Sequence, residues 1–98
     1  MNITQHAYKR AKERLSWKGS VLDKMSRRAL HHGKQHSDTV GRLNKYITKL
    51  FFDHKKANNI RIYGENAFLF HGSTLLTLYR IPTHLIKLLK GGENSEGN

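Results

Sequence analysis

The stretch "NIRIYGENAFLFHGSTLLTLYRI", residues 59–81, sets the expected architecture of this chain. It contains three apolar runs, 59–63, 67–70 and 74–81, separated by short segments that include glycine. Runs of strand-forming residues bounded by such turns are typical of β-strands joined by hairpins. Pro82 ends the third run, because proline has no N–H to give to a sheet. The stretch therefore predicts an antiparallel β-meander.

The residues before this stretch have helical periodicity. Residues 5–15 and 20–32 each carry an apolar stripe at spacings of three and four, and Gly33 suits the end of the second. A third pattern, which predicts a core-facing helix side, consists of Val40, Leu43, Ile47, Leu50 and Phe51. The run 53–59 is interpreted as a solvated helix C-terminus.

Helices followed by a meander predict an α+β domain. We expect N-terminal helices packed on the C-terminal meander, in a single layer on one sheet face, with the other face partly open and basic. The length favours one domain, over residues 1–90. The glycine-rich tail, residues 91–98, is expected to be disordered.

Charge gives the strongest indication of a partner. The formal net charge is +11 over 98 residues, and the last eight residues hold two of the seven acidic side chains and no basic one. Such a basic body favours a polyanionic partner, and nucleic acid is the first candidate, with RNA preferred. An acidic protein, such as an antitoxin or a host target, is a further candidate partner.

Other classes of protein are not favoured by the composition. There is no cysteine, which excludes disulfides, thiolate zinc sites and a cysteine nucleophile. No apolar run approaches the roughly 18 residues that a membrane span needs, and no apolar signal-peptide core follows the N-terminus. We expect a cytoplasmic protein with no membrane partner and no cofactor.

A row of polar side chains opens the chain. In "ITQHAYKRAKER", residues 3–14, His6, Arg10 and Arg14 recur every four residues and form one line along a helix. This line lies beside the Ala7–Ala11 stripe, about 100° around the helix. We therefore expect it at the seam between this helix and the rest of the domain.

Three segments resemble a known family when taken together. They are "HAYKRAKER", "NNIRIYG" and "LLTLYRIP", which give an opening His-Ala-x-x-Arg motif and a closing Leu-hydrophobic-Thr-hydrophobic strand. The arrangement is similar to small bacterial and prophage proteins of the RelE/ParE-like toxin superfamily, the barnase–EndoU–colicin–RelE fold group. The resemblance implies a toxin-like, metal-independent endoribonuclease, or a derivative of that fold, that acts on RNA through a basic sheet face. Other members of that group are gyrase poisons and not nucleases.

Ribonuclease chemistry without a metal needs a base, an acid and cations that stabilise the charge on the phosphate. Histidine suits the first two roles, because imidazole titrates near neutral pH, and arginine suits the third. The resemblance implies His6 as acid or base, with Arg10, Arg14 and Arg61 as phosphate clamps. The full expected catalytic set is His6, Arg10, Arg61 and Tyr79. The residues expected to bind nucleic acid are Arg14, Arg27, Arg28, Lys45, Lys49, Tyr63 and Thr77.

This catalytic set depends on a shared sheet face. Arg61 and Tyr63 alternate together on one strand, and Thr77 and Tyr79 do so on another. If these two faces coincide, the four side chains meet the His6 row. The structural alternative is that the tyrosines are half-buried sheet residues, that His6 packs at the seam, and that the arginines are solvated.

Other functions remain open from the sequence. Three helices and a meander also describe a winged-helix-like, non-catalytic nucleic-acid-binding module. A phage-encoded inhibitor that binds an acidic host protein would also be small and basic. The residues His31, His32 and His36 have no carboxylate or cysteine beside them, so we expect no metal site.

Overall fold

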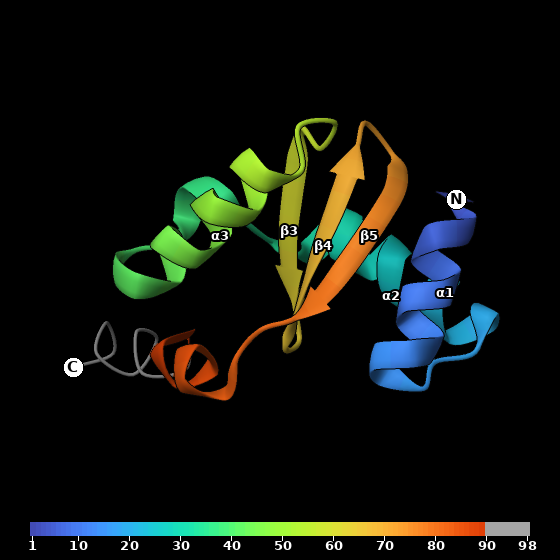
Figure 1. Cartoon of the computed structure of the whole chain (residues 1–98), viewed down its shortest axis with the longest axis horizontal. Coiled ribbons are helices and arrows are strands. Elements are labelled where there is room, and N and C mark those ends of the chain that lie inside the picture. Colours follow the sequence, from blue (N-terminus) through green and yellow to red (C-terminus); the bar gives the residue numbers. More distant parts are fainter. Residues whose placement is uncertain (90–98) are drawn as a thin grey trace.

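The computed structural model describes residues 1–89, and Figure 1 shows the arrangement of its elements. In chain order they are β1 (Asn2–Ile3), α1 (Gln5–Leu15), α2 (Gly19–His32), β2 (Lys34–Gln35), the 3₁₀ turn η1 (His36–Asp38), α3 (Gly41–Asp53), β3 (Asn59–Tyr63), β4 (Asn66–His71) and β5 (Thr74–Arg80). Residues 83–89 are also helical. The α+β class is therefore confirmed. The tail expected to be disordered, residues 91–98, lies outside the described residues.

The sheet has five strands in the order β1-β5-β4-β3-β2. The three long strands, β3, β4 and β5, pair antiparallel and form the meander that the sequence predicts. Gly64 and Gly72 lie in its two turns with φ of 60°, a left-handed conformation that glycine adopts without a Cβ penalty. The two-residue strands β1 and β2 extend the sheet at its edges, parallel to β5 and antiparallel to β3 respectively.

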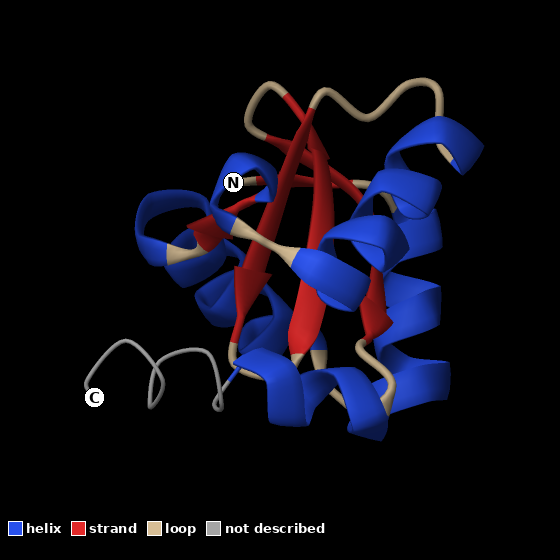
Figure 2. Cartoon of the chain, turned by 90° about the vertical axis from the view of Figure 1, so that its left-hand side faces the viewer, coloured by secondary structure: helices blue, strands red, loops and turns tan. Residues whose placement is uncertain are grey.

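Helices cover both faces of this sheet, as Figure 2 shows. Strand β4 is buried on both sides: Phe68 and Phe70 pack toward α1 and α2, whereas Ala67 and Leu69 pack toward α3 and residues 83–89. The expectation of a single helix layer and an open basic face is therefore wrong. Its physical cause is that β4 has no polar alternation, a pattern that demands apolar cover on each side.

Helix α1 sits close to the sheet because its contact residues are small. Ala7 and Ala11 are fully buried, and α1 packs mainly against β5. Thr4 caps the first turn, since its side chain accepts a hydrogen bond from the backbone N–H of Ala7. This close approach brings the polar row of α1 to the edge of the sheet.

The structure confirms most of the apolar side that the sequence predicts for helix α3. Leu43, Ile47 and Leu50 are buried against the sheet. The prediction is wrong for Val40 and Phe51: Val40 precedes the helix and is 79% exposed, and Phe51 is 38% exposed. None of the helices among residues 1–89 has the length and hydropathy of a membrane-spanning segment.

Candidate functional site

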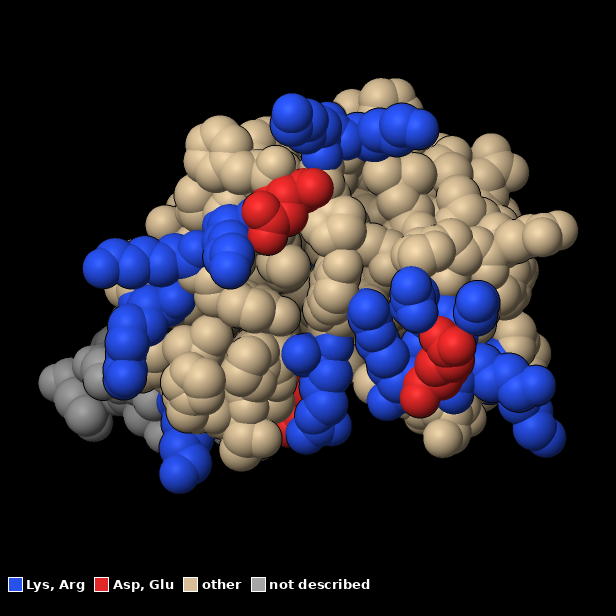
Figure 3. All heavy atoms as spheres, in the orientation of Figure 1, with Lys and Arg blue, Asp and Glu red and all other residues tan. Residues whose placement is uncertain are grey.

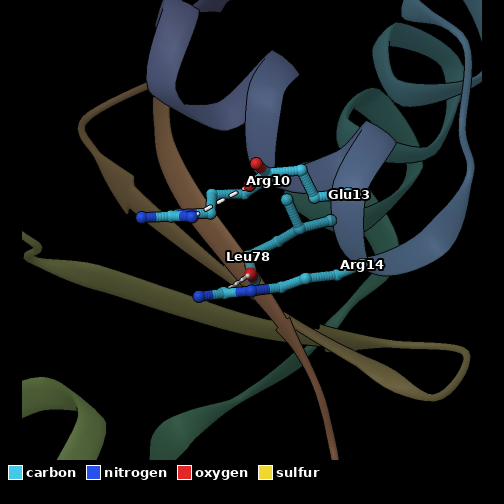
Figure 4. Close-up of polar contacts among 4 residues, drawn as sticks. All are labelled: Arg10, Glu13, Arg14 and Leu78. Carbon is cyan, nitrogen blue, oxygen red and sulfur yellow. Dashed lines mark hydrogen bonds and ion pairs between the residues drawn. The ribbon is translucent and has the colours of Figure 1, made fainter.

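Strand β1 covers only part of the outer edge of strand β5. The pairing of β1 with β5 ends at Ile3 and Leu75. Beyond it, side chains of the first helical segment take over: the Thr4 hydroxyl donates to the carbonyl oxygen of Leu76 at 2.9 Å. Arg14 Nη1 donates to the carbonyl oxygen of Leu78, also at 2.9 Å (Figure 4). The side chains of Thr4 and Arg14 thus satisfy carbonyl groups of β5 that a neighbouring strand would otherwise bond.

Arg10 and Arg14 extend side by side across this edge, as Figure 4 shows. Arg10 Nη1 forms an ion pair with Glu13 Oε1 at 2.9 Å, and its Nε is buried with no partner among residues 1–89. The pair is partly exposed and holds Arg10 weakly. Both guanidinium groups therefore keep N–H donors for an anion.

A chain of contacts runs from Arg14 to a histidine that the sequence did not single out. The Arg14 guanidinium carbon lies 4.4 Å from the ring centre of Tyr79, a cation–π distance. The Tyr79 hydroxyl lies 2.7 Å from His54 Nε2. His54 follows α3 and is half-buried, so the interpretation of 53–59 as only a solvated helix C-terminus is wrong at this position. The Tyr79 hydroxyl therefore holds the His54 ring in a fixed orientation.

His54 and His6 line the same pocket of about 360 Å³. The pocket is lined by Thr4, His6, His54, Lys55, Lys56, Leu76 and Thr77. Thr77 is only 2% exposed, and its hydroxyl has no hydrogen-bond partner in the described residues. A buried hydroxyl without a partner is costly unless a ligand or water satisfies it. We call this pocket and the neighbouring arginines the β5-edge site: His6, Arg10, Arg14, His54, Thr77 and Tyr79.

Basic side chains frame the site from two directions. In Figure 3 they gather over α1 on the right and over the segment that joins α3 to β3 at the top. The second group includes Lys55 and Lys56, which are exposed beside the pocket. Cations on opposite sides of one hollow raise the local potential for an anion such as phosphate.

Tyr46 of α3 belongs to the same neighbourhood. Burial raises the pKa of Tyr46, the nearby Tyr79 raises it further, and Arg14 lowers it. At neutral pH, Tyr46 is therefore a protonated phenol. The folded protein holds this proton at a pH where the unfolded chain releases it, so its stability falls as the pH rises past about 10.

We expect the variant Tyr46→Phe to lose less stability at alkaline pH than the wild type. Phenylalanine keeps the ring and has no proton to release, so this one contribution disappears. The measurement is the free energy of unfolding in urea at about pH 8 and about pH 11. An equal fall in both proteins would contradict the assignment.

Arg61 and Tyr63 do not join the β5-edge site, and the expectation that the two faces coincide is wrong. Arg61 pairs across the sheet with Phe68, which pairs with Leu78, and these three point toward α1 and α2. Thr77 pairs with Leu69 and points to the other face.

Arg61 instead makes hydrogen bonds that hold the fold together. Its Nη1 donates to the carbonyl oxygen of Gly33 at 3.2 Å, and its Nε donates to Asn59 Oδ1 at 3.1 Å. A Cβ on Gly33 would lie 2.9 Å from the Cβ of Arg61, so only glycine allows this approach. Arg61 thus ties the end of α2 to β3.

The other residues expected to bind nucleic acid lie on both sides of the molecule. Arg27 and Arg28 are exposed on α2, and Arg27 is paired with Asp23 at 2.8 Å. Lys45 and Lys49 are exposed on α3, which covers the opposite sheet face. Of these two pairs, only the lysines of α3 lie on the side of the sheet to which Thr77 points.

The three clustered histidines are also separated by the fold. His31 and His32 are exposed at the end of α2, whereas His36 Nε2 is bonded to the Thr48 hydroxyl at 2.8 Å. Over residues 1–89, no group of three or more histidine and acidic side chains has a metal-binding arrangement.

The chain was compared with known proteins in three ways. Neither the protein-family models, nor the curated proteins, nor the solved structures contain a match to it. The assignment of function therefore depends on the geometry of the β5-edge site.

Proposed function

We propose that this protein is a metal-independent endoribonuclease whose active site is the β5-edge site. One observation carries the proposal: His6 and His54 line a single pocket above the unpartnered hydroxyl of Thr77. Two imidazoles that face one cavity can act as a base and an acid on the same phosphodiester. The surrounding arginines and lysines match the charge of that phosphate.

The reaction is an internal transfer at phosphorus. His6, as a neutral imidazole, accepts the proton of the ribose 2′-hydroxyl, and the 2′-oxygen forms a bond to phosphorus. The bond from phosphorus to the 5′-oxygen breaks, and His54 gives that oxygen a proton. The products are a 2′,3′-cyclic phosphate and a 5′-hydroxyl, so atoms and charge balance without an added reactant.

Each remaining group of the site has a role in this scheme. Arg10 and Arg14 stabilise the negative charge that develops on the phosphate oxygens. The Thr77 hydroxyl donates to one of those oxygens. The Tyr79 oxygen accepts the Nε2–H of His54 and so keeps Nδ1 free for the leaving oxygen.

The resemblance to the RelE/ParE-like superfamily agrees with this proposal, since its opening motif supplies His6 and Arg10 and its closing strand supplies Thr77. Arg61 is no longer part of the proposed site. The alternative is that this basic chain is a binding protein without catalytic activity. Its partner would then be nucleic acid or an acidic protein.

The test is cleavage of a labelled single-stranded RNA by the full chain in excess EDTA. We expect cleavage, with a 2′,3′-cyclic phosphate on the 5′ product. An RNA with one 2′-deoxy residue should resist cleavage at that residue, because the nucleophile is missing there. Cleavage that stops in EDTA, or intact RNA bound with a steep salt dependence, would contradict the proposal and favour metal-dependent cleavage or binding alone.

A further inference from the structure

A second pocket, of about 420 Å³, lies between η1, α3 and the start of β3. Its lining includes four carboxamide side chains, Gln35, Asn44, Asn58 and Asn59, and the aromatic ring of Phe51. We call it the amide pocket. We propose that it binds a nucleobase next to the cleaved phosphate, with a preference for guanine, and this proposal rests on the proposed ribonuclease function.

Asn44 offers no free donor, because its NH₂ group donates to the carbonyl and hydroxyl oxygens of Thr39. In the other three amides it is the oxygen that the protein occupies. Asn58 Oδ1 accepts from the backbone N–H of Gly72 at 2.9 Å, and Asn59 Oδ1 accepts from Arg61 Nε at 3.1 Å. The Gln35 side chain accepts from the backbone N–H of Asp38 in a capping box. These contacts fix the flip of the Gln35, Asn58 and Asn59 amides and leave their NH₂ groups as the free ends.

Free NH₂ groups select a base edge that consists of acceptors. Guanine presents two adjacent acceptors, N7 and O6, whereas adenine presents the N7 acceptor beside the N6 donor. A pocket of amide donors therefore favours guanine over adenine. The same donors are repelled by the adenine N6 amino group.

The aromatic side of the pocket suits stacking. Phe51 is 38% exposed, and its ring centre lies 5.9 Å from that of His36 and 5.7 Å from that of Phe52. Phe52 is 69% exposed. Exposed aromatic rings beside hydrogen-bonding groups are the common platform for unpaired RNA bases. Tyr79 does not offer this platform, because the Arg14 guanidinium lies over its ring.

One short segment joins the amide pocket to the β5-edge site. His54, Lys55 and Lys56 line the pocket of the β5-edge site, and Asn58 and Asn59 line the amide pocket. The Cα atoms of Lys56 and Asn58, two residues apart, are separated by at most about 7 Å. The proposal places adjacent nucleotides of one strand in these two pockets.

The first experiment measures base preference with RNAs that differ only in the bases flanking the cleaved bond. We expect guanine to give a kcat/KM higher than adenine by roughly 5- to 150-fold. In the variants Asn58→Asp and Gln35→Glu, an oxygen replaces the NH₂ group while the oxygen contact to the protein remains. Both variants should lose the preference for guanine.

The control is Gln5→Glu, which adds the same charge on α1, outside the amide pocket. This variant should lower kcat/KM for all RNAs by the same factor. The ratio of kcat/KM for guanine to that for adenine should stay unchanged. Intact cleavage with equal rates for guanine and adenine would overturn the amide pocket while leaving the proposed function in place.

The second experiment needs no catalysis. Guanosine 5′-monophosphate is titrated into the wild-type protein while the side-chain NH₂ signals of Gln35, Asn58 and Asn59 are followed by NMR. We expect shifts with this nucleotide and much smaller shifts with adenosine 5′-monophosphate. Absent shifts, or equal shifts with both nucleotides, would overturn the inference even if the protein cleaves no RNA.

Discussion

Replacing His54 with alanine is expected to slow RNA cleavage by about 10²- to 10⁴-fold, the usual contribution of a general acid or base. The fold should survive this change. The helix-capping contact of His54 is made by its backbone N–H to the carbonyl oxygen of Leu50, and alanine keeps it. The side-chain contact that disappears is the 2.7 Å bond to the Tyr79 hydroxyl. Single-turnover cleavage of a labelled RNA measures the effect.

The matched control is His31→Ala, because His31 is exposed at the end of α2 and contacts no residue of the β5-edge site. It should cleave at the wild-type rate. Tyr79→Phe keeps the ring under Arg14 and removes the hydroxyl, so it should reduce the rate less than His54→Ala does. Wild-type cleavage by His54→Ala would remove His54 from the reaction.

Replacing Phe68 with alanine is expected to cost about 3–5 kcal/mol of stability. Phe68 is fully buried at the centre of β4, and its ring centre lies 6.3 Å from that of Trp17 and 6.5 Å from that of Phe70. A domain of this size has a free energy of unfolding of only about 5–15 kcal/mol, so the loss is a large fraction of the total.

The measurement for Phe68→Ala is urea unfolding followed by the fluorescence of Trp17. Phe52→Ala is the control, since Phe52 is a phenylalanine of the same volume that is 69% exposed on α3. Its stability should stay within about 0.5 kcal/mol of the wild type. Equal losses in the two variants would mean that the β4 core does not pack as described.

The meander could be predicted from sequence because its signals are local. Apolar runs and turn residues mark β3, β4 and β5, and Gly64 and Gly72 fall at the two turns. Strand β2 could not be predicted, because a strand of two polar residues, Lys34 and Gln35, has no pattern of its own. It forms only because β3 offers a free edge.

Only part of the candidate site could be predicted from the sequence. A single bulge explains why the faces of Arg61 and Thr77 do not coincide. In a regular hairpin that starts with His71 opposite Thr74, Phe68 would lie opposite Thr77, and Arg61 would then share the face of Thr77. The register shifts by one residue between Leu69 and Phe70. A shift of one residue moves every later side chain to the opposite face, and here it carries Thr77 and Tyr79 away from Arg61.

The position of the α1 row was predictable, and its partner His54 was not. The helical wheel places His6, Arg10 and Arg14 at a seam, where the structure has them along β5. His54 comes from a segment whose lysines and asparagines indicate solvent. Its approach to Tyr79 depends on how α3 crosses the sheet, which no local pattern encodes.

The central claim is that His6 and His54 act as base and acid on one phosphodiester, and the most direct test is the pH dependence of cleavage in EDTA. We predict a bell-shaped profile of kcat/KM for the wild type, because one imidazole must be neutral and the other protonated. His6→Ala should lose the dependence on the acidic side, and His54→Ala should lose it on the basic side. The claim would be contradicted if both variants kept the bell-shaped profile of the wild type, or if the wild type cleaved no RNA at any pH.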